Sequence, residues 1–165
     1  MAEMMLENML LAREERWHKR MELSKKCESL ISISLCIPLP FRTGEKEKDA
    51  LRKKCVEIEK MLLTAGFPVE SREELDGADG LTVYLLSAGG ENLKRFCVEI
   101  EESLPNGRLL DIDITSKIPI GRSELGLPPR SCFICLRPAA ECVASGRHSR
   151  EEIAQFIKMC GLTDS

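Results

Sequence analysis

The pattern of residues 107–115 predicts a β-strand that contains two aspartates, Asp111 and Asp113, separated by one residue. Side chains alternate between the two faces of a strand, so both carboxylates point to the same side. Two like charges this close together repel each other, and a divalent cation, which prefers hard oxygen ligands, would relieve that repulsion. The pattern therefore favours a metal site. A solvated edge strand with two surface carboxylates is the alternative interpretation.

Three cysteines and a histidine follow the aspartates with the spacing C-x2-C-x6-C-x5-H. They are Cys132, Cys135, Cys142 and His148. Three thiolates and one imidazole form a complete tetrahedral ligand set for zinc. The alternative is a group of buried or half-buried residues without a metal, in which His148 contacts phosphate or serves as a general base.

The region after the aspartates is basic. Residues 116–150 contain Lys117, Arg122, Arg130, Arg137, Arg147 and Arg150 against only Glu124 and Glu141. Carboxylates that hold a metal, followed by arginines that bind phosphate, are typical of a site for a polyphosphate substrate. A charged surface loop is the alternative.

The whole chain has 165 residues and a formal net charge of -3, so its overall charge indicates no attraction to nucleic acid or to a membrane. It contains no run of about 18 apolar residues, which a membrane-spanning helix would need. The beginning Met-Ala-Glu argues against a secretion signal, and we expect a cytoplasmic protein. Its eight cysteines would then be reduced, because disulfides are rare in that compartment.

The spacing of the apolar residues predicts the elements that position these motifs. In order, they are a helix at 2–28, a strand at 30–37, a loop at 41–45, a helix at 46–65, strands at 67–75 and 81–87, a helix at 91–104 and the strand at 107–115. The succession strand, helix, strand, strand, helix, strand is that of the split βαβ, or ferredoxin-like, plan of the α+β class. We expect one domain over residues 1–165. It would comprise an N-terminal helix at 1–29, a ferredoxin-like core at 30–116 and a basic, cysteine-rich tail with a C-terminal helix at 117–165.

In that plan the helices cover one face of the sheet and leave the other face open. The open face would collect the polar side chains of Ser32, Ser34, Thr82, Tyr84, Asp111 and Asp113. The first helix and the tail would cover this polar floor, and Arg13, Arg16 and Arg20 share one side of that helix because they are three and four residues apart. Glu101 is expected on the helix before the aspartates and not beside them.

Several of these motifs resemble those of one enzyme family. They are Gly-Arg-Leu-Leu-Asp-Ile-Asp-Ile at 107–114, Gly-Arg at 121–122, Leu-Pro-Pro-Arg-x-Cys-x-x-Cys at 127–135, Ala-x-Cys at 140–142 and Arg-His-Ser at 147–149. The Arg-Glu-Glu-Arg segment at 13–16 and the strand at 30–32, with its Pro-x-Pro exit, also fit, so the resemblance spans nearly the whole chain. The family is that of the apo-citrate lyase phosphoribosyl-dephospho-CoA transferases, or citrate lyase holo-acyl-carrier-protein synthases.

The resemblance implies a nucleotidyltransferase. Its donor would be triphosphoribosyl-dephospho-CoA, and its acceptor a serine of the citrate lyase acyl-carrier (gamma) subunit. The 2'-(5''-phosphoribosyl)-3'-dephospho-CoA group would become attached through a phosphodiester, and pyrophosphate would leave.

The resemblance also implies roles for individual residues. Asp111 and Asp113 would hold Mg2+ across the triphosphate, and Asp111, Asp113 and His148 are the candidates for the base that accepts the serine proton. The candidate phosphate-binding residues are Arg108, Arg122, Arg130 and Arg147, with Arg13 and Arg16 from the first helix. The expectation of zinc at the cysteine and histidine cluster, in a structural role, rests instead on the types and spacing of those residues.

Two other classes of function are compatible with the sequence. One is a zinc-stabilised binding module without catalysis, in which the aspartate pair is incidental. The other is a pyrophosphokinase-like enzyme that acts on a small molecule, because the strand at 108–113 is similar to the metal-binding strand of hydroxymethyl-dihydropterin pyrophosphokinase. Consumption of ATP by the purified chain alone would distinguish such a kinase from a transferase.

Overall fold

A five-stranded antiparallel sheet forms the centre of the molecule in this computed structural model, which describes residues 2–160. Its strands are β1 (Ser29–Leu35), β2 (Val69–Gly77), β3 (Gly80–Ser87), β4 (Leu110–Thr115) and β5 (Pro119–Ile120). They lie in the order β2-β3-β1-β4-β5, with every neighbouring pair antiparallel. Strands β3, β1 and β4, which contain the residues of the predicted polar floor, are therefore consecutive neighbours in the middle of the sheet.

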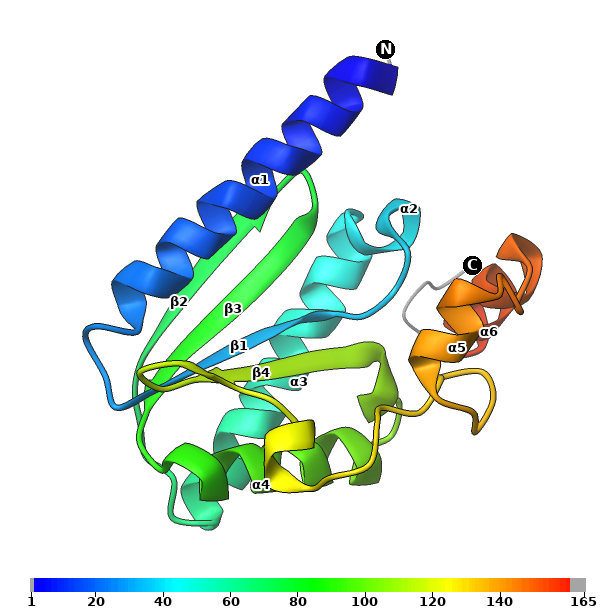
Figure 1. Cartoon of the computed structure of the whole chain (residues 1–165). Helices are drawn as coiled ribbons and strands as arrows, with labels where there is room; N and C mark the ends of the chain where they lie inside the picture. Colours follow the sequence, from blue (N-terminus) through cyan, green and yellow to red (C-terminus); the bar gives the residue numbers. More distant parts are fainter. Residues whose placement is uncertain (1, 161–165) are drawn as a thin grey trace.

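Helices cover both faces of this sheet (Figure 1). They are α1 (Ala2–Leu23), α2 (Leu39–Arg42), α3 (Glu45–Thr64), α4 (Gly90–Ser103), α5 (Ala139–Ala144) and α6 (Arg150–Met159). Helices α3 and α4 pack on one face, α1 lies across β2 and β3 on the other, and α5 and α6 gather beside the beginning of β4, on the side of α2. None of the helices within residues 2–160 is long and apolar enough to cross a membrane.

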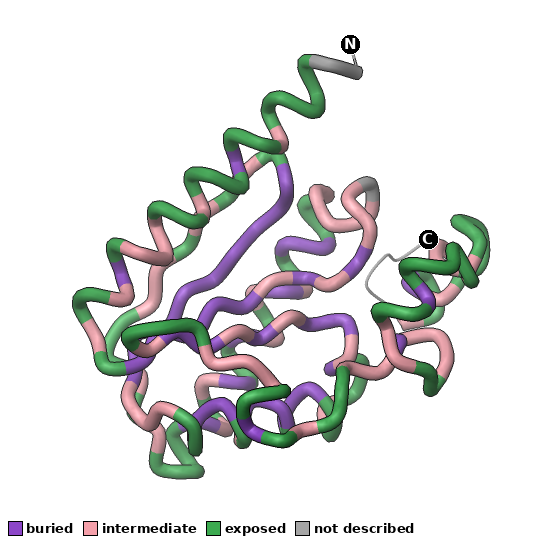
Figure 2. Tube along the Cα trace, viewed as in Figure 1, coloured by how far each residue is buried: buried purple, intermediate pink, exposed green. Residues whose placement is uncertain are grey.

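The main hydrophobic core lies between the sheet and helices α3 and α4. Alternate strand residues such as Ile31, Ile33, Ile112 and Ile114 are almost fully buried in it, as the purple strands in Figure 2 show. Ile157 of α6 joins the same core, so the C-terminal segment packs against the sheet domain. A smaller cluster of Leu23, Leu30, Tyr84 and Leu86 lies under the end of α1, on the opposite face.

The predicted succession of strands and helices up to β4 is observed, although some bounds differ and short elements are added. The first helix ends at Leu23 instead of residue 28, and the chain adds a short edge strand, β5. Residues 41 and 42 of the expected loop form the end of the short helix α2, which starts after the N-cap residue Pro38 and has Pro40 in its first turn. Proline is well suited to the first turn of a helix because its fixed φ is helical and its missing N–H would be unpaired there anyway.

The predicted strand at 107–115 begins later than expected. Its first three residues, Gly107–Leu109, form a 3-10 turn, and β4 starts at Leu110. A Cβ atom on Gly107 would lie 2.6 Å from the backbone oxygen of Glu101, so the chain can pass helix α4 there only with glycine. Strand alternation consequently does not extend to Arg108 and Leu109, and the prediction that they continue the two faces of the strand is wrong.

Candidate active site and metal cluster

The polar face expected from strand alternation is formed by β1, β3 and β4. Ser34 is paired with Asp111 and Ser32 with Asp113, and Ser32 is also paired with Tyr84. The Tyr84 hydroxyl donates a hydrogen bond to the backbone oxygen of Arg16 at 3.2 Å, so helix α1 covers this face. The two carboxylates therefore lie between the sheet and the elements expected to cover it.

Asp111 is held by an arginine from the tail. Nη2 of Arg130 donates to Oδ1 of Asp111 at 2.7 Å and to Oε1 of Glu101 at 2.7 Å, while its Nη1 donates to the backbone oxygen of Leu110 at 2.8 Å. Burial works against the charge on Arg130, but the nearby carboxylates of Glu101 and Asp111 raise its pKa. This arginine thus ties the tail to the beginning of β4.

Asp113 has looser cationic neighbours. Nη2 of Arg20, on helix α1, lies 3.5 Å from its Oδ2, and Nζ of the buried Lys94 lies 3.9 Å from its Oδ1. Arg20 was expected on the side of the first helix that carries Arg13 and Arg16, and its contact with Asp113 shows that this side reaches the polar floor.

Both carboxylates remain accessible to a ligand. The side chains of Asp111 and Asp113 are 42% and 45% exposed, respectively. A Mg2+ ion usually takes one or two protein carboxylates and completes its shell with phosphate oxygens and water. Two hard oxygen donors on one accessible face fit that requirement.

Helix α4 closes the free edge of β4 with two buried charged side chains. Nζ of Lys94 donates to the backbone oxygen of Ile112 at 2.8 Å, and the Ile112 backbone N–H donates to Oε1 of Glu101 at 2.8 Å. A bare strand edge would leave these groups unpaired and open to other chains. The edge is therefore sealed beside the two aspartates.

Glu101 also accepts a hydrogen bond from Nη2 of Arg122 at 2.5 Å, in addition to the one from Arg130. The prediction that Glu101 lies on the helix is confirmed, but the prediction that it is not beside the aspartates is wrong, because Glu101 binds the Ile112 N–H between them and shares Arg130 with Asp111. One signal was available. Lys94 and Glu101 lie seven residues apart within the apolar stripe of α4, where isolated surface charges are not expected.

A cavity of about 490 Å³ lies between the ends of β1 and β4 and the tail. Its charged and metal-ligating lining residues are Arg16, Arg42, Arg108, Asp111, Arg130, Cys132, Cys142 and His148. Cavities of this volume are typical of small-molecule sites. A second cavity of about 460 Å³ lies along α3 and contains none of the predicted site residues.

Three of the six predicted phosphate-binding arginines line the first cavity. Arg16 forms an ion pair with the buried Asp79 in the β2–β3 turn. Nη1 of Arg108 donates to the backbone oxygen of Cys132 at 3.0 Å. With Arg130, these residues make the wall strongly cationic.

The other three predicted arginines do not line this cavity. Arg13 and Arg147 are exposed, and Arg122 is engaged by Glu101 and Glu102. The structure thus distinguishes the arginines that face the cavity from Arg122, which forms ion pairs with helix α4, and from the two exposed arginines.

Arg42 lines the cavity as well, although it is not among the arginines predicted to bind phosphate. It ends the short helix α2, in a segment expected to be a loop. The signal in the sequence that could have found Arg42 is its position just after the Pro38-x-Pro40 exit from the first predicted strand.

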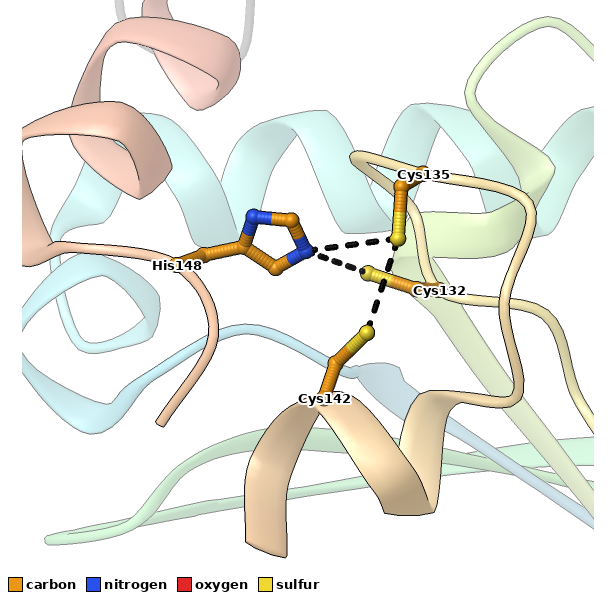
Figure 3. A group of neighbouring side chains, drawn as sticks. All are labelled: Cys132, Cys135, Cys142 and His148. Carbon is orange, nitrogen blue, oxygen red and sulfur yellow. Dashed lines mark hydrogen bonds between the residues drawn. The ribbon is translucent and has the colours of Figure 1, made fainter. Parts of the chain in front are cut away.

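The predicted metal ligands come together at one side of the cavity (Figure 3). Nε2 of His148 lies 3.5 Å from Sγ of Cys132 and 3.4 Å from Sγ of Cys135, and Sγ of Cys135 lies 3.5 Å from Sγ of Cys142. The four ligand atoms all lie within 4.8 Å of one another. Ligand atoms around a tetrahedral zinc ion are about 3.6 to 3.8 Å apart, so this group can hold a metal ion.

Local hydrogen bonds explain how the first two cysteines meet. The backbone N–H of Cys132 donates to the backbone oxygen of Arg137 at 2.8 Å. The backbone N–H of Ala139 donates to the backbone oxygen of Arg130, also at 2.8 Å. The Ile134 N–H points at Sγ of Cys132 at 3.4 Å. These contacts close a tight loop that places both thiols on the same side.

Two short helices supply the remaining ligands. Cys142 lies on α5, and His148 directly precedes α6. The N-terminus of α6 is fixed by a capping box in which Ser149 and Glu152 each accept a backbone hydrogen bond from the other. A capped helix start of this kind fixes the chain at the histidine.

The thiols differ in how readily they ionise. A backbone hydrogen bond from Arg137 lowers the pKa of Cys135 to about 7, so this thiol is a ready metal ligand near neutral pH. Burial raises the pKa of Cys142 to about 11, and the adjacent sulfurs of Cys135 and Cys132 add to that shift. A divalent cation would supply the positive charge that lets all three thiolates coexist.

Comparison with known proteins agrees with the motifs. The family model described as apo-citrate lyase phosphoribosyl-dephospho-CoA transferase matches residues 4–161. A protein of Streptococcus pyogenes serotype M18 named probable apo-citrate lyase phosphoribosyl-dephospho-CoA transferase is 35% identical over 160 residues, which cover 92% of this chain and 82% of the relative.

Two enterobacterial relatives have the same enzyme name. The proteins of Escherichia coli O139:H28 and Citrobacter koseri are each 27% identical over 149 residues, which cover 88% of this chain and 81% of the relative. The resemblance inferred from the sequence motifs is confirmed, and the chain belongs to the apo-citrate lyase phosphoribosyl-dephospho-CoA transferase family.

Proposed function

We propose that this protein transfers the 2'-(5''-phosphoribosyl)-3'-dephospho-CoA group from triphosphoribosyl-dephospho-CoA to a serine of the acyl-carrier (gamma) subunit of citrate lyase. The observation that supports this most is the cavity, because it combines an accessible carboxylate of the Asp111–Asp113 pair with several arginines. A polyphosphate bound through a metal and guanidinium groups requires that combination.

The proposed reaction exchanges a phosphoanhydride bond for a phosphate ester bond. The serine hydroxyl oxygen bonds to the α-phosphorus of the donor's 5''-triphosphate. The bond from that phosphorus to the oxygen bridging to the β-phosphate breaks, and pyrophosphate leaves with the electron pair. Such a transfer needs positioning and charge neutralisation more than covalent participation by the protein.

The residues divide into those that would touch the donor and those that position them. Asp111 and Asp113 would hold Mg2+, which when bound would neutralise the triphosphate. Arg16 and Arg108 face the cavity that Asp111 lines and would contact phosphate oxygens. Arg130 keeps the Asp111 carboxylate in place through its contact at 2.7 Å.

The cysteine and histidine cluster fits a structural zinc ion. Three thiolates and one imidazole fill a tetrahedral shell without leaving a position for substrate, as in structural sites. Nε2 of His148 faces Cys132 and Cys135, so we assign His148 to metal binding. That assignment leaves Asp111 and Asp113 as the candidates for a base.

We also infer that the core belongs to the ferredoxin-like class. The strand order β2-β3-β1-β4 with helices α3 and α4 on one face supports this inference, since that plan leaves the second face of the sheet free for a site. Here the second face is the one that contains Asp111 and Asp113.

Intact-mass measurement tests the function directly. The purified protein is incubated with the apo acyl-carrier subunit, the triphosphate donor and Mg2+, and the carrier subunit should gain the mass of the group while pyrophosphate appears in equal amount. A carrier subunit with its acceptor serine replaced by alanine is the control and should gain nothing. No mass gain with the native carrier would overturn the proposal, and ATP consumption without any carrier would indicate a pyrophosphokinase instead.

A further inference from the structure

Arg42 is the cation of the cavity wall with the most unusual surroundings. It ends helix α2, and its backbone packs against the β2–β3 turn at Gly80. A Cβ atom on Gly80, which has φ of +105°, would lie 3.0 Å from the Arg42 backbone oxygen and 3.3 Å from its Cγ. The stem of Arg42 is thus held by a tight contact, and its head group lines the cavity.

The guanidinium group of Arg42 has no partner within residues 2–160. No carboxylate there forms an ion pair with it, and its Nε is buried without a hydrogen bond. Burial, followed by the nearby Arg13, lowers the pKa of Arg42, and burial together with Arg42 lowers that of Arg16. Of these neighbouring cations, Arg16 forms an ion pair with Asp79, whereas no described carboxylate lies within ion-pair distance of Arg42 and, among the carboxylates, only the more distant charge of Asp111 acts in its favour.

An unpaired, half-buried cation among other cations is unfavourable in the unliganded protein. It becomes favourable when an anion enters the cavity. Guanidinium groups bind phosphate with two parallel hydrogen bonds, which suits a group fixed at the wall of a site.

We propose that Arg42 binds the diphosphate end of the donor, the part that leaves as pyrophosphate, with Arg16 beside it. Asp111 lines the same cavity, so the metal-binding side and the unpaired guanidinium group would flank one polyphosphate chain. The identity of the donor rests on the proposed function, whereas the affinity of Arg42 for a diphosphate does not.

Calorimetric titration of the full-length protein with pyrophosphate in the presence of Mg2+ tests this proposal. Arg42→Gln should weaken binding about tenfold or more, because a charge-assisted hydrogen-bonding group is lost. Arg42→Lys should bind with intermediate affinity, since it keeps the charge but not the planar fork. Arg52→Gln is the matched control, because Arg52 lies on α3 and pairs with Asp49 and Glu74, and its pyrophosphate affinity should equal that of the wild type.

Thermal unfolding separates this role from a structural one. Removing an unpaired cation should leave the Tm of Arg42→Gln unchanged or higher, whereas loss of a structural contact would lower it. Wild-type affinity for pyrophosphate in Arg42→Gln, or weaker binding that merely accompanies a lower Tm, would overturn the proposal. If Arg42→Gln does not fold, wild-type affinity in Arg42→Lys would overturn it.

The intact-mass assay distinguishes a failure of this proposal from a failure of the proposed function. If the wild-type protein transfers no group to the carrier but Arg42→Gln still loses pyrophosphate binding, the proposed reaction fails and the anion site stands. If the wild type transfers the group and Arg42→Gln matches it in both transfer and pyrophosphate affinity, the anion site fails and the reaction stands.

Discussion

Replacing Glu101 by glutamine would remove the negative charge that holds Arg122 and Arg130 while keeping nearly the same side-chain shape. Glu101 is 2% exposed and accepts hydrogen bonds from the Ile112 N–H and from two arginines, Arg122 and Arg130. Both carboxylate oxygens of Glu101 accept from N–H donors. Glutamine has only one acceptor oxygen, so its NH2 group would face one of these donors and the hydrogen bond there would be lost. Both ion pairs lose their negative partner, and the two guanidinium groups are left close to each other.

The expected cost follows from these contacts. A hydrogen bond to a charged group contributes about 1.5 to 3 kcal/mol, and breaking a buried ion pair by removing one partner costs about 3 to 5 kcal/mol. Glutamine retains part of the hydrogen bonding, so we expect a loss of about 3 kcal/mol in the free energy of unfolding. For a chain of this size, that corresponds to a Tm lower by about 6 to 12 °C.

Differential scanning calorimetry and the intact-mass transfer assay measure the two consequences. Transfer should fall as well, since Arg130 would keep only Asp111 and a backbone oxygen as partners. Glu102→Gln is the matched control, because Glu102 is 57% exposed and lies 3.3 Å from Arg122, and exposed pairs contribute about 0.5 kcal/mol. Equal Tm values for the Glu101→Gln and wild-type proteins, or an equal loss in Glu102→Gln, would refute the reasoning.

Three further predictions concern the donor site and the metal cluster. Asp111→Asn and Asp113→Asn should each fold normally and lose most transfer activity, with the double variant little worse than either, because residues that act as one unit are not additive; near-normal transfer at limiting Mg2+ would assign both a structural role. Arg130→Lys should reduce transfer although the charge is kept, since lysine cannot donate to Asp111, Glu101 and Leu110 together; full activity would show that charge alone suffices. Protein purified without chelator should contain about one zinc per chain by mass spectrometry and Cys135→Ser should lose it with a lower Tm, whereas metal-free wild-type protein of normal stability would exclude the zinc site.

Local sequence patterns were sufficient to predict which residues share a face. The alternation from Leu110 to Ile114 places Asp111 and Asp113 opposite Ser34 and Ser32 in the observed register. The period of two in a strand is a local property, so it can be read without knowing the partner strands. The spacing of the cysteines and histidine is similarly local, because all four lie within one short segment.

The partners of the charged residues could not be predicted in this way. Arg20 reaches Asp113 across 93 positions of the chain, and Arg130 reaches Asp111 across 19. Such contacts depend on how elements pack and not on the period within any one of them. The unpaired state of Arg42 is likewise visible only after packing shows which carboxylates lie near it.

The cysteine and histidine cluster and the proposed catalytic strand are joined by hydrogen bonds. Arg130 stands two residues before Cys132 and binds Asp111, while Arg108, just before β4, donates to the backbone oxygen of Cys132. The loop that supplies the first cysteine therefore cannot move away from the sheet without breaking its contacts with Arg108 and Asp111. The main core consists largely of the strands with α3 and α4, so loss of a metal would leave the sheet intact and release one wall of the cavity. Zinc would thus support transfer by fixing the residues around Asp111 and not by taking part in the chemistry.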